Sequence, residues 1–433
     1  MRCIDAGENL KVGMAVIGSN ELAIEGGAPV RDSKSRPWPV WPSTSDAEWR
    51  EKIEPAFRRV YESQAEGVGG REQKRFARRF ADYCGVPHCV LVAHGTDALA
   101  TALAATLDLD GIRDGGEVIV PNYTFIASAS AALDMQCSVV LTDIDPKTFT
   151  LCPAAVERAV RPGRTRAIMV VHIAGQPCDM NAINAIARKH GLTVVEDCAQ
   201  AHGALHEGAR VGSLGDVAGF SFQSSKNLCS GEGGCVTTRD IGIFNRSVGM
   251  MNSGRLPAGE RWNYARIGWN YRPSEYVAAL LTARLDDLEQ QSDHRTRMAE
   301  YLTSRIENIP GVTPPANGPW CSRHDYHLYC ILIDEAKFGG RPRNDVVDAL
   351  QAEGIPAMAG YTEPLSEQPG MRQLAADHPN AVRVEPCPAT EEVCRRSVWI
   401  AGQILLAGSE DMDEIATALA KVQSAFNRRA PGS

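Results

Sequence analysis

Apolar, β-branched runs alternate with helix-like segments through residues 89–251. The runs have the length of strands, and strands alternating with helices indicate parallel βαβ units with helices on both faces of one sheet. Ligands then bind beyond the carboxyl ends of the strands. The predicted strands are residues 89–93, 117–121, 139–144, 167–173, 193–196 and 217–222, and the predicted helices are residues 98–107, 125–134, 153–161, 180–190 and 243–251.

The pattern differs on either side of this region. A stretch rich in Pro and Trp, residues 26–43, predicts an extended segment that lies on another surface, and amphipathic helices follow at 46–63 and 71–83. From Ser274 one long helical stretch and then a second one run to a stop at Pro310-Gly311. A strand at 327–333 and helices at 343–353 and 412–426 complete the chain. We therefore expect an N-terminal extension (residues 1–43), a large domain (44–285) and a smaller α+β C-terminal domain (286–433).

Composition narrows the class of protein. The chain has 433 residues, 44% of them hydrophobic and 23% charged, as is usual for a globular enzyme. A net charge of -8 argues against nucleic acid and anionic membrane surfaces as partners. No apolar run approaches the ~18 residues of a membrane span, and the N-terminus makes a poor signal peptide, so we expect a cytoplasmic protein. The 13 cysteines show no CxxC pair, which argues against disulfides and a metal site.

An acid and a lysine mark the candidate chemistry. The apolar run at 193–196 leads into Asp197, and Lys226 follows the strand at 217–222 in a loop of Ser and Gly residues. Two buried strands can therefore bring a carboxylate and an amine to one cofactor. Pyridoxal phosphate (PLP) needs both, because its aldehyde forms a Schiff base with a lysine and its ring nitrogen is kept protonated by a carboxylate. We assign these catalytic roles to Lys226 and Asp197.

Gly95-Thr96 lies in the turn between the first predicted strand (89–93) and the helix that follows it (98–107). Free N–H groups and the positive end of the helix dipole make such a turn a phosphate site. His172 at a strand end is a candidate for contact with a substrate, and so are the loop residues Tyr361, Trp399 and Gln403. Trp38 and Trp41 of the extended N-terminal segment serve either as substrate contacts or as part of a tail that wraps across a dimer.

Several stretches resemble the DegT/StrS family of sugar aminotransferases. The resemblance covers residues 24–425 and keeps one order along the chain. It is carried by HGTDALATAL (94–103), GGEVIVPNYTFIAS (115–128), DIDPKTF (143–149), RAIMVVHIAGQPCDM (166–180), VVEDCAQAHGA (194–204), VGSLGD (211–216), FSFQSSKN (220–227), GEGG (231–234) and GWNYRPSEYVAALL (268–281).

The resemblance implies a fold type I PLP enzyme and assigns further residues. By similarity, Ser221 joins Gly95 and Thr96 at the cofactor phosphate, Phe125 stacks on the pyridine ring and Gln200 lies near the cofactor hydroxyl. Asn270 and Arg272 match positions that reach the phosphate in the neighbouring subunit, which implies a homodimer with shared active sites. The family also implies L-glutamine or L-glutamate as amino donor.

Three functions remain open at this point. The first is an aminotransferase that acts on a ketone of a cyclitol, sugar or cyclohexenone-type metabolite, as in antibiotic biosynthesis. The second is a dehydrating and aromatising enzyme similar to aminohydroxybenzoate synthases, which the segment SVWIAGQILLAG (397–408) resembles. The third is a non-catalytic regulatory homologue; loss of Lys226 or an appended DNA-binding helix pair would favour it, and the sequence shows neither.

Overall fold

The predicted strands meet in one large sheet. The computed structural model describes residues 21–109, 114–256 and 262–428, so residues 1–20 of the predicted extension lie outside the described residues. The large sheet has the strand order β1-β9-β8-β5-β4-β2-β3-β14. Its strands are β1 (His88–Val92), β2 (Glu117–Pro121), β3 (Ser138–Thr142), β4 (Thr165–Val171), β5 (Thr193–Asp197), β8 (Val217–Ser221), β9 (Gly234–Thr238) and β14 (Val382–Val384).

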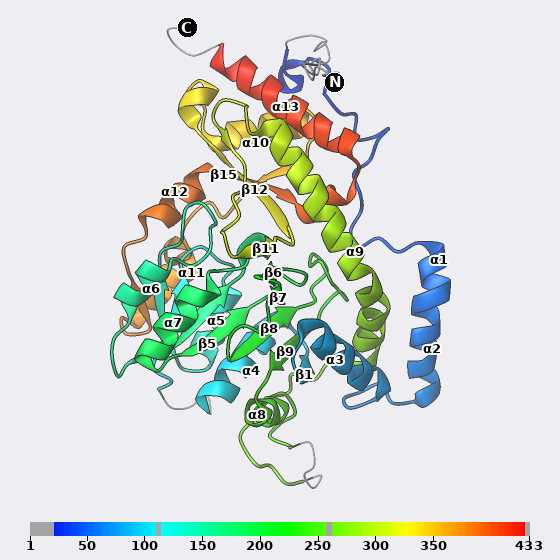
Figure 1. Cartoon of the computed structure of the whole chain (residues 1–433), viewed down its shortest axis with the longest axis vertical. Helices are drawn as coiled ribbons and strands as arrows, with labels where there is room; N and C mark the ends of the chain where they lie inside the picture. The colour runs from blue at the N-terminus through cyan, green and yellow to red at the C-terminus, as the bar shows by residue number, and fades with distance from the viewer. Residues whose placement is uncertain (1–20, 110–113, 257–261, 429–433) are drawn as a thin grey trace, which may run out of the picture.

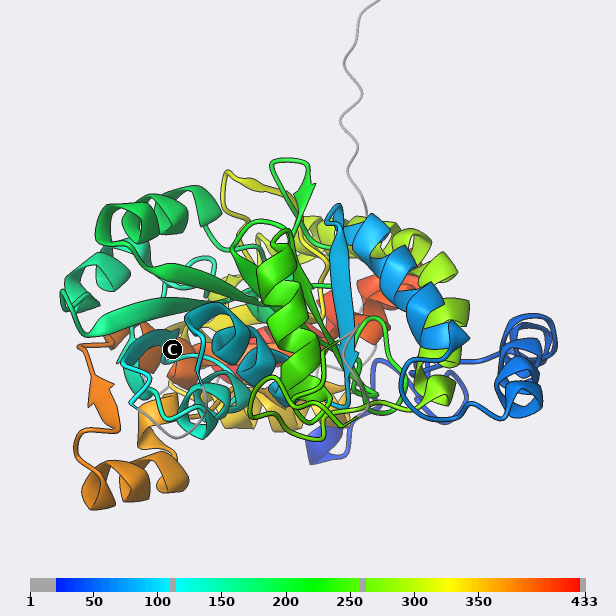
Figure 2. The same cartoon turned by 90° about the horizontal axis from the view of Figure 1, so that it is seen from below.

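The pairing is mainly parallel, as expected. Strands β14, β3, β2, β4, β5 and β8 pair in parallel, while β9 runs opposite to both of its neighbours. Both faces of the sheet are apolar: Val118 and Val120 of β2 pack in one core cluster, and Ile119 packs in another on the opposite face. This alternation with a period of two residues requires a helical layer on each side. Figure 2 shows helices on both faces.

The helices cover the sheet in the order of the βαβ units. Helices α4 and α5 pack on the face of Val118, and α6 and α7 pack on the face of Ile119. The bounds are α1 (Asp46–Glu48), α2 (Glu54–Ser63), α3 (Arg71–Cys84), α4 (Gly95–Leu107), α5 (Ala127–Asp134), α6 (Pro153–Ala159), α7 (Met180–His190), α8 (Ile241–Met251), α9 (Glu275–Ile306), α10 (Arg343–Ala352), α11 (Pro369–Asp377), α12 (Pro388–Arg396) and α13 (Ser409–Asn427). A π-helical turn, Trp49–Ile53, joins α1 to α2 into the single helix predicted for residues 46–63.

Helix α9 corrects the expectation of two helices after Ser274. It is one helix of 32 residues, Glu275–Ile306. Its sequence contains neither Gly nor Pro, so nothing in it ends the helix early. The helix packs on α3 at one end and on α13 at the other, and Figure 1 shows it running between the two parts of the molecule. The predicted domain boundary between residues 285 and 286 therefore falls inside a continuous helix.

The C-terminal part builds a second, antiparallel sheet. This four-stranded sheet has the order β10-β12-β15-β13, with β10 (Val312–Thr313), β12 (Leu328–Ile333), β13 (Ala357–Ala359) and β15 (Ser397–Ala401). A three-stranded sheet combines β11 (Cys321–Arg323) with β6 (Leu205–His206) and β7 (Ala209–Arg210). Between β13 and β15 the chain returns to the large sheet as β14. Over the described residues, every helix is too short or too polar to cross a membrane.

The N-terminal segment is fixed to the C-terminal part through a buried carboxylate. Glu353 is fully buried and accepts hydrogen bonds from the N–H groups of Ala23 (2.9 Å) and Val30 (3.0 Å). It also accepts one from the buried Nζ of Lys421 at 2.8 Å. The indole N–H of Trp38 donates to the neighbouring Gly354 carbonyl at 2.8 Å. The segment therefore lies on the C-terminal part, held by these polar bonds and by Val30 and Trp38, which pack against its core.

We predict that Glu353→Ala lowers the free energy of unfolding by about 3 kcal/mol, because it leaves the Lys421 ammonium buried without its partner. Urea titration followed by fluorescence measures this. Glu307→Ala, at an exposed position just beyond α9, is the matched control and should change stability by less than about 0.5 kcal/mol. Equal midpoints for the two variants would contradict the assigned role of Glu353.

Candidate active site

The carboxyl ends of the parallel strands surround one cavity of about 860 Å³. The carboxyl ends of five strands contribute to its wall, with Gly95 and Thr96 after β1, Thr124 and Phe125 after β2, Val171 at the end of β4, Asp197 and Gln200 at and after the end of β5, and Ser221 and Lys226 at and after the end of β8. The structure thus brings together the residues that the sequence assigned to one cofactor. A cavity of this volume holds a ligand of cofactor size together with a small substrate.

Asp197 ends β5 and points toward the cavity. Its carboxylate accepts hydrogen bonds from the Ser128 hydroxyl at 2.7 Å and from the Ala199 N–H at 3.1 Å. Burial raises the pKa of Asp197, whereas Ser128, Ala199 and the Lys226 charge lower it, and the balance leaves the pKa above its ordinary value. A buried acid in this state gains from a cation or a positively charged N–H placed beside it. A protonated pyridine nitrogen is such a group.

Lys226 lies in the turn after β8, and that turn fixes its backbone. Its N–H donates to the Gln223 carbonyl, and its own carbonyl accepts from the Trp41 indole at 3.1 Å. Within the described chain the Nζ atom makes no hydrogen bond or ion pair. Burial lowers the pKa of Lys226, and Asp197 partly offsets this. A larger share of the amine is therefore uncharged near neutral pH, which is the form that attacks an aldehyde.

The first turn of α4 has the features of an anion site. His94 is the N-cap residue and its side chain makes no capping bond, and no hydrogen bond occupies the N–H of Gly95 or Thr96 within the described chain. A methyl group at Gly95 would lie 2.5 Å from Cβ of Ser221, so glycine is required for Ser221 to approach the turn. Backbone N–H groups, a hydroxyl and the helix dipole together suit a phosphate.

The remaining walls are aromatic and polar. Phe125 lies on the cavity wall and is 60% exposed, so its ring face is free to cover a planar ligand. Tyr361 and Trp399 also line the cavity and pack edge to face, with ring centroids 4.8 Å apart. Gln200 accepts a hydrogen bond from the Ala174 N–H at 2.7 Å and bonds to Tyr361. Gln403 and Trp41 line the cavity as well, whereas Trp38 lies beneath the Arg31 guanidinium instead.

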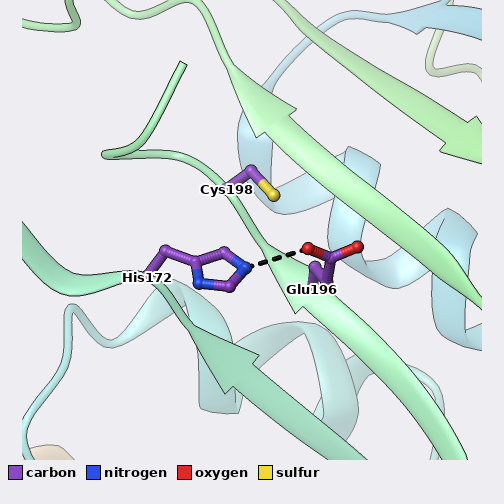
Figure 3. A group of neighbouring side chains, drawn as sticks. All are labelled: His172, Glu196 and Cys198. Atoms are coloured by element: carbon purple, nitrogen blue, oxygen red, sulfur yellow. Dashed lines mark hydrogen bonds and ion pairs between the residues drawn. The ribbon is translucent and has the colours of Figure 1, made fainter. Parts of the chain in front are cut away.

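His172 does not line the cavity, which corrects its assignment as a substrate contact. Its ring is fully buried, with Nδ1 accepting the Cys178 N–H at 3.1 Å and Nε2 lying 3.0 Å from the Glu196 carboxylate (Figure 3). Side chains alternate along β5, so Glu196 faces away from the cavity that Asp197 faces. Glu196 also accepts the N–H groups of Gly212, Leu214 and Gly215. The histidine therefore helps to hold the loop before β8.

Cys198 lies beside this pair, and the ligand atoms of His172, Glu196 and Cys198 are within 4.8 Å of one another. Such spacing is compatible with a metal ion. However, His172 Nδ1 and both Glu196 oxygens are already hydrogen-bonded, and burial holds the pKa of the Cys198 thiol well above its usual range. A neutral thiol is a poor ligand. We therefore assign the cluster a structural role.

Asn270 and Arg272 lie outside the cavity. Asn270 is exposed and pairs with Asn252, and Arg272 donates to the Ser253 hydroxyl at 2.9 Å. Their predicted contact with a neighbouring subunit stays a prediction. Arg295 and His327 are among the cavity residues that the sequence analysis missed, and it also missed Ser128, which holds Asp197. The sequence did hold a sign of Arg295. It lies three residues after Ser292 and four before Ala299, on the buried face of α9, where a charged residue is unusual.

Comparison with known proteins agrees with this geometry. The DegT/DnrJ/EryC1/StrS aminotransferase family matches residues 48–420, and the chain belongs to that family. An L-glutamine:2-deoxy-scyllo-inosose aminotransferase of Streptoalloteichus tenebrarius is 38% identical over 93% of this chain and 97% of the relative. An L-glutamine:scyllo-inosose aminotransferase of Streptomyces griseus is 36% identical over 93% and 97%.

Among solved structures, 3-amino-5-hydroxybenzoic acid synthase matches with a TM-score of 0.79 and 32% identity, over 89% of this chain and 98% of that one. The fold is that of the fold type I PLP-dependent aminotransferases, as the sequence predicted.

We predict that Gly95→Ala weakens PLP binding at least about tenfold, because the added methyl displaces Ser221 from the anion site and hydrogen bonds to a charged group are lost. Equilibrium dialysis with absorbance detection measures the dissociation constant. Gly67→Ala is the control, since a methyl group there meets nothing within 4 Å. If the two variants bind PLP equally well, the phosphate does not bind at this turn.

Proposed function

We propose that this protein transfers the amino group of L-glutamine to the ketone carbon of a six-membered polyhydroxylated ring of the scyllo-inosose class. The observation that carries this proposal is that Lys226 and Asp197 line one cavity and influence each other electrostatically. Relatives that share 36–38% identity over nearly their whole length are named for this donor and this class of acceptor. The balanced reaction is L-glutamine plus ketone giving 2-oxoglutaramate plus the ring amine.

The residues present fit PLP as the cofactor. Gly95, Thr96 and Ser221 would hold its phosphate, Phe125 would cover its ring, and Asp197 would face its ring nitrogen. When bound, PLP supplies an aldehyde that exchanges amines and a ring that accepts the electron pair left when a C–H bond is broken. The raised pKa of Asp197 and the lowered pKa of Lys226 support this assignment. A protonated ring nitrogen would give Asp197 a positive partner, and an uncharged Lys226 amine is ready to react with the aldehyde.

The protein's own groups then have distinct tasks. Lys226 Nζ would take the proton from the donor's Cα and later release it, acting as base and then as acid. In the second half-reaction Lys226 would deliver a proton to the ring carbon that receives the amino group. Asp197 would face the ring nitrogen and keep it protonated, and Ser128 and Ala199 hold its carboxylate in place. The polar side chains of Gln223, Ser225 and Gln403 line the cavity where ring hydroxyls would lie.

A dehydrating and aromatising reaction is the second candidate, favoured by the structural match to 3-amino-5-hydroxybenzoic acid synthase. Both reactions need the lysine, so the site residues do not separate them. Product analysis does. Incubation with L-glutamine and 2-deoxy-scyllo-inosose should give an amine by mass spectrometry, and an aminodehydroshikimate-like compound should give no aromatic product. The opposite pair of results would replace the proposed function with the second candidate.

We predict that Asp197→Asn binds PLP and remains yellow but transaminates about a hundredfold more slowly or worse. The substitution keeps the size of the side chain and removes the charge that protonates the ring nitrogen, at a cost on the order of a few kcal/mol in the transition state. Single-turnover kinetics with L-glutamine measure it. Asp143→Asn, another buried strand-end acid that lies outside the cavity, should keep normal turnover. Unchanged turnover in Asp197→Asn would make Asp197 a structural acid.

We further propose an active homodimer in which Asn270 and Arg272 complete the partner's site. The family resemblance and the position of both residues outside their own cavity support this. An inactive Lys226→Ala chain mixed with an inactive Asn270→Ala, Arg272→Ala chain should regain about a quarter of wild-type activity, since half the dimers are mixed and one site in each is intact. No recovery despite demonstrated subunit exchange would show that each site is built from one chain.

A further inference from the structure

Two basic residues outside the roles above share a wall of the cavity with Lys226. Arg295 comes from α9 and His327 from the residue before β12, and both line the cavity although they are 1% and 8% exposed. They lie close enough to each other and to Lys226 for their charges to interact. The acids that line the cavity, Asp97, Asp197 and Glu232, belong to other connections.

The Arg295 guanidinium is incompletely satisfied by the protein. Nε donates to the Asp325 carbonyl at 3.3 Å and Nη2 donates to the Ser292 hydroxyl at 3.4 Å, both long bonds. Nη1 makes no hydrogen bond to any described residue. The Asp325 carboxylate lies 3.5 Å from Nη2 and also accepts bonds from the Gly203 N–H and the Asn227 amide. A buried arginine with open N–H groups at a cavity wall points to an anionic ligand.

His327 adds a second open donor. Its ring makes no hydrogen bond with any described residue, and only burial and neighbouring charges act on it. Burial, followed by the charges of Lys226, His202 and Arg295, holds the pKa of His327 well below its ordinary value, so the ring is neutral. A neutral imidazole still carries one N–H. Arg295 and His327 can therefore hold one anion between them without adding a second full charge beside Lys226.

We propose that Arg295, assisted by His327, binds the α-carboxylate of the amino donor. This inference rests on the proposed function and deepens it. The donor's Cα must reach Lys226 Nζ, and its carboxylate, one bond away, must lie within a few ångströms of that amine. Arg295 is the arginine on the wall of this cavity, and planar guanidinium groups pair well with carboxylates. A keto-cyclitol has no carboxylate, so Arg295 contributes to binding only in the half-reaction with the amino donor.

The test separates the two half-reactions. In Arg295→Met, the L-glutamine concentration for half-maximal conversion of the bound cofactor should rise at least about tenfold. Amination of the keto-cyclitol by protein loaded with the aminated cofactor should stay within about twofold of wild type. Binding of glutaramate, which is L-glutamine without its α-amine, should weaken at least about tenfold by calorimetry. An equal loss in both half-reactions, or unchanged glutaramate binding, would overturn the proposal.

Arg323→Met is the matched control. Arg323 is 8% exposed and pairs with Glu289 and Asp293, but it does not line the cavity. Both half-reactions and glutaramate binding should keep their wild-type values in this variant. If Arg295→Met fails to fold, Arg295→Lys keeps a positive charge and loses the planar fork, and it should show the same donor-specific loss in weaker form. An Arg295→Lys protein with wild-type glutaramate affinity would also overturn the proposal.

Failure of the proposed function gives a different result. In that case no keto-cyclitol is aminated by the wild-type protein, while L-glutamine still converts the cofactor and glutaramate still binds through Arg295. If the wild-type protein neither responds to L-glutamine nor binds glutaramate, the carboxylate site itself is wrong.

Discussion

The parallel pairing of β5 with β8 is the constraint on which the site depends. Asp197 pairs with Gly219 across this ladder, so the loop that follows β8 starts beside the carboxylate that ends β5. Lys226 lies in that loop and shares the cavity with Asp197. A slip of one residue in β5 would turn Asp197 away from the cavity and bring Glu196 into it. The buried bonds of Glu196 to His172 and to the loop before β8 oppose such a slip.

The geometry of β5 also explains how two carboxylates can be buried in the core of the sheet. Glu196 and Asp197 are both buried at adjacent positions, but they face opposite sides of the sheet. Glu196 is satisfied by protein groups: an imidazole and three backbone N–H groups. Asp197 has fewer protein donors, and burial holds its pKa above its ordinary value. One carboxylate therefore stabilises the fold, and the other is left for a ligand. Arg295 also has few protein hydrogen bonds, but it is a cation and is left for an anionic ligand.

Local patterns predicted the elements that depend on local sequence. The strands β1, β2, β3, β4, β5 and β8 and the gathering of their carboxyl ends followed from apolar runs and from the rules for parallel sheets. The family resemblance added Ser221, Phe125 and Gln200, which the structure places on the cavity wall. What failed depends on contacts distant in sequence. The return of β14 to the large sheet is such a contact, and so is the burial of His172 against Glu196. Arg295 was missed because a charged residue in a helix is usually solvated, although its position on the buried face of α9 was visible.

The most direct test of the central claim is the absorbance spectrum of the protein reconstituted with PLP, followed by borohydride reduction and mass spectrometry of its peptides. The account predicts a visible band from the lysine-bound cofactor, with the reduced adduct on Lys226. The band should be absent in Lys226→Ala and present in the control Lys189→Ala, where the lysine is exposed on α7. A wild-type protein without this band, or an adduct on another lysine, would contradict the account.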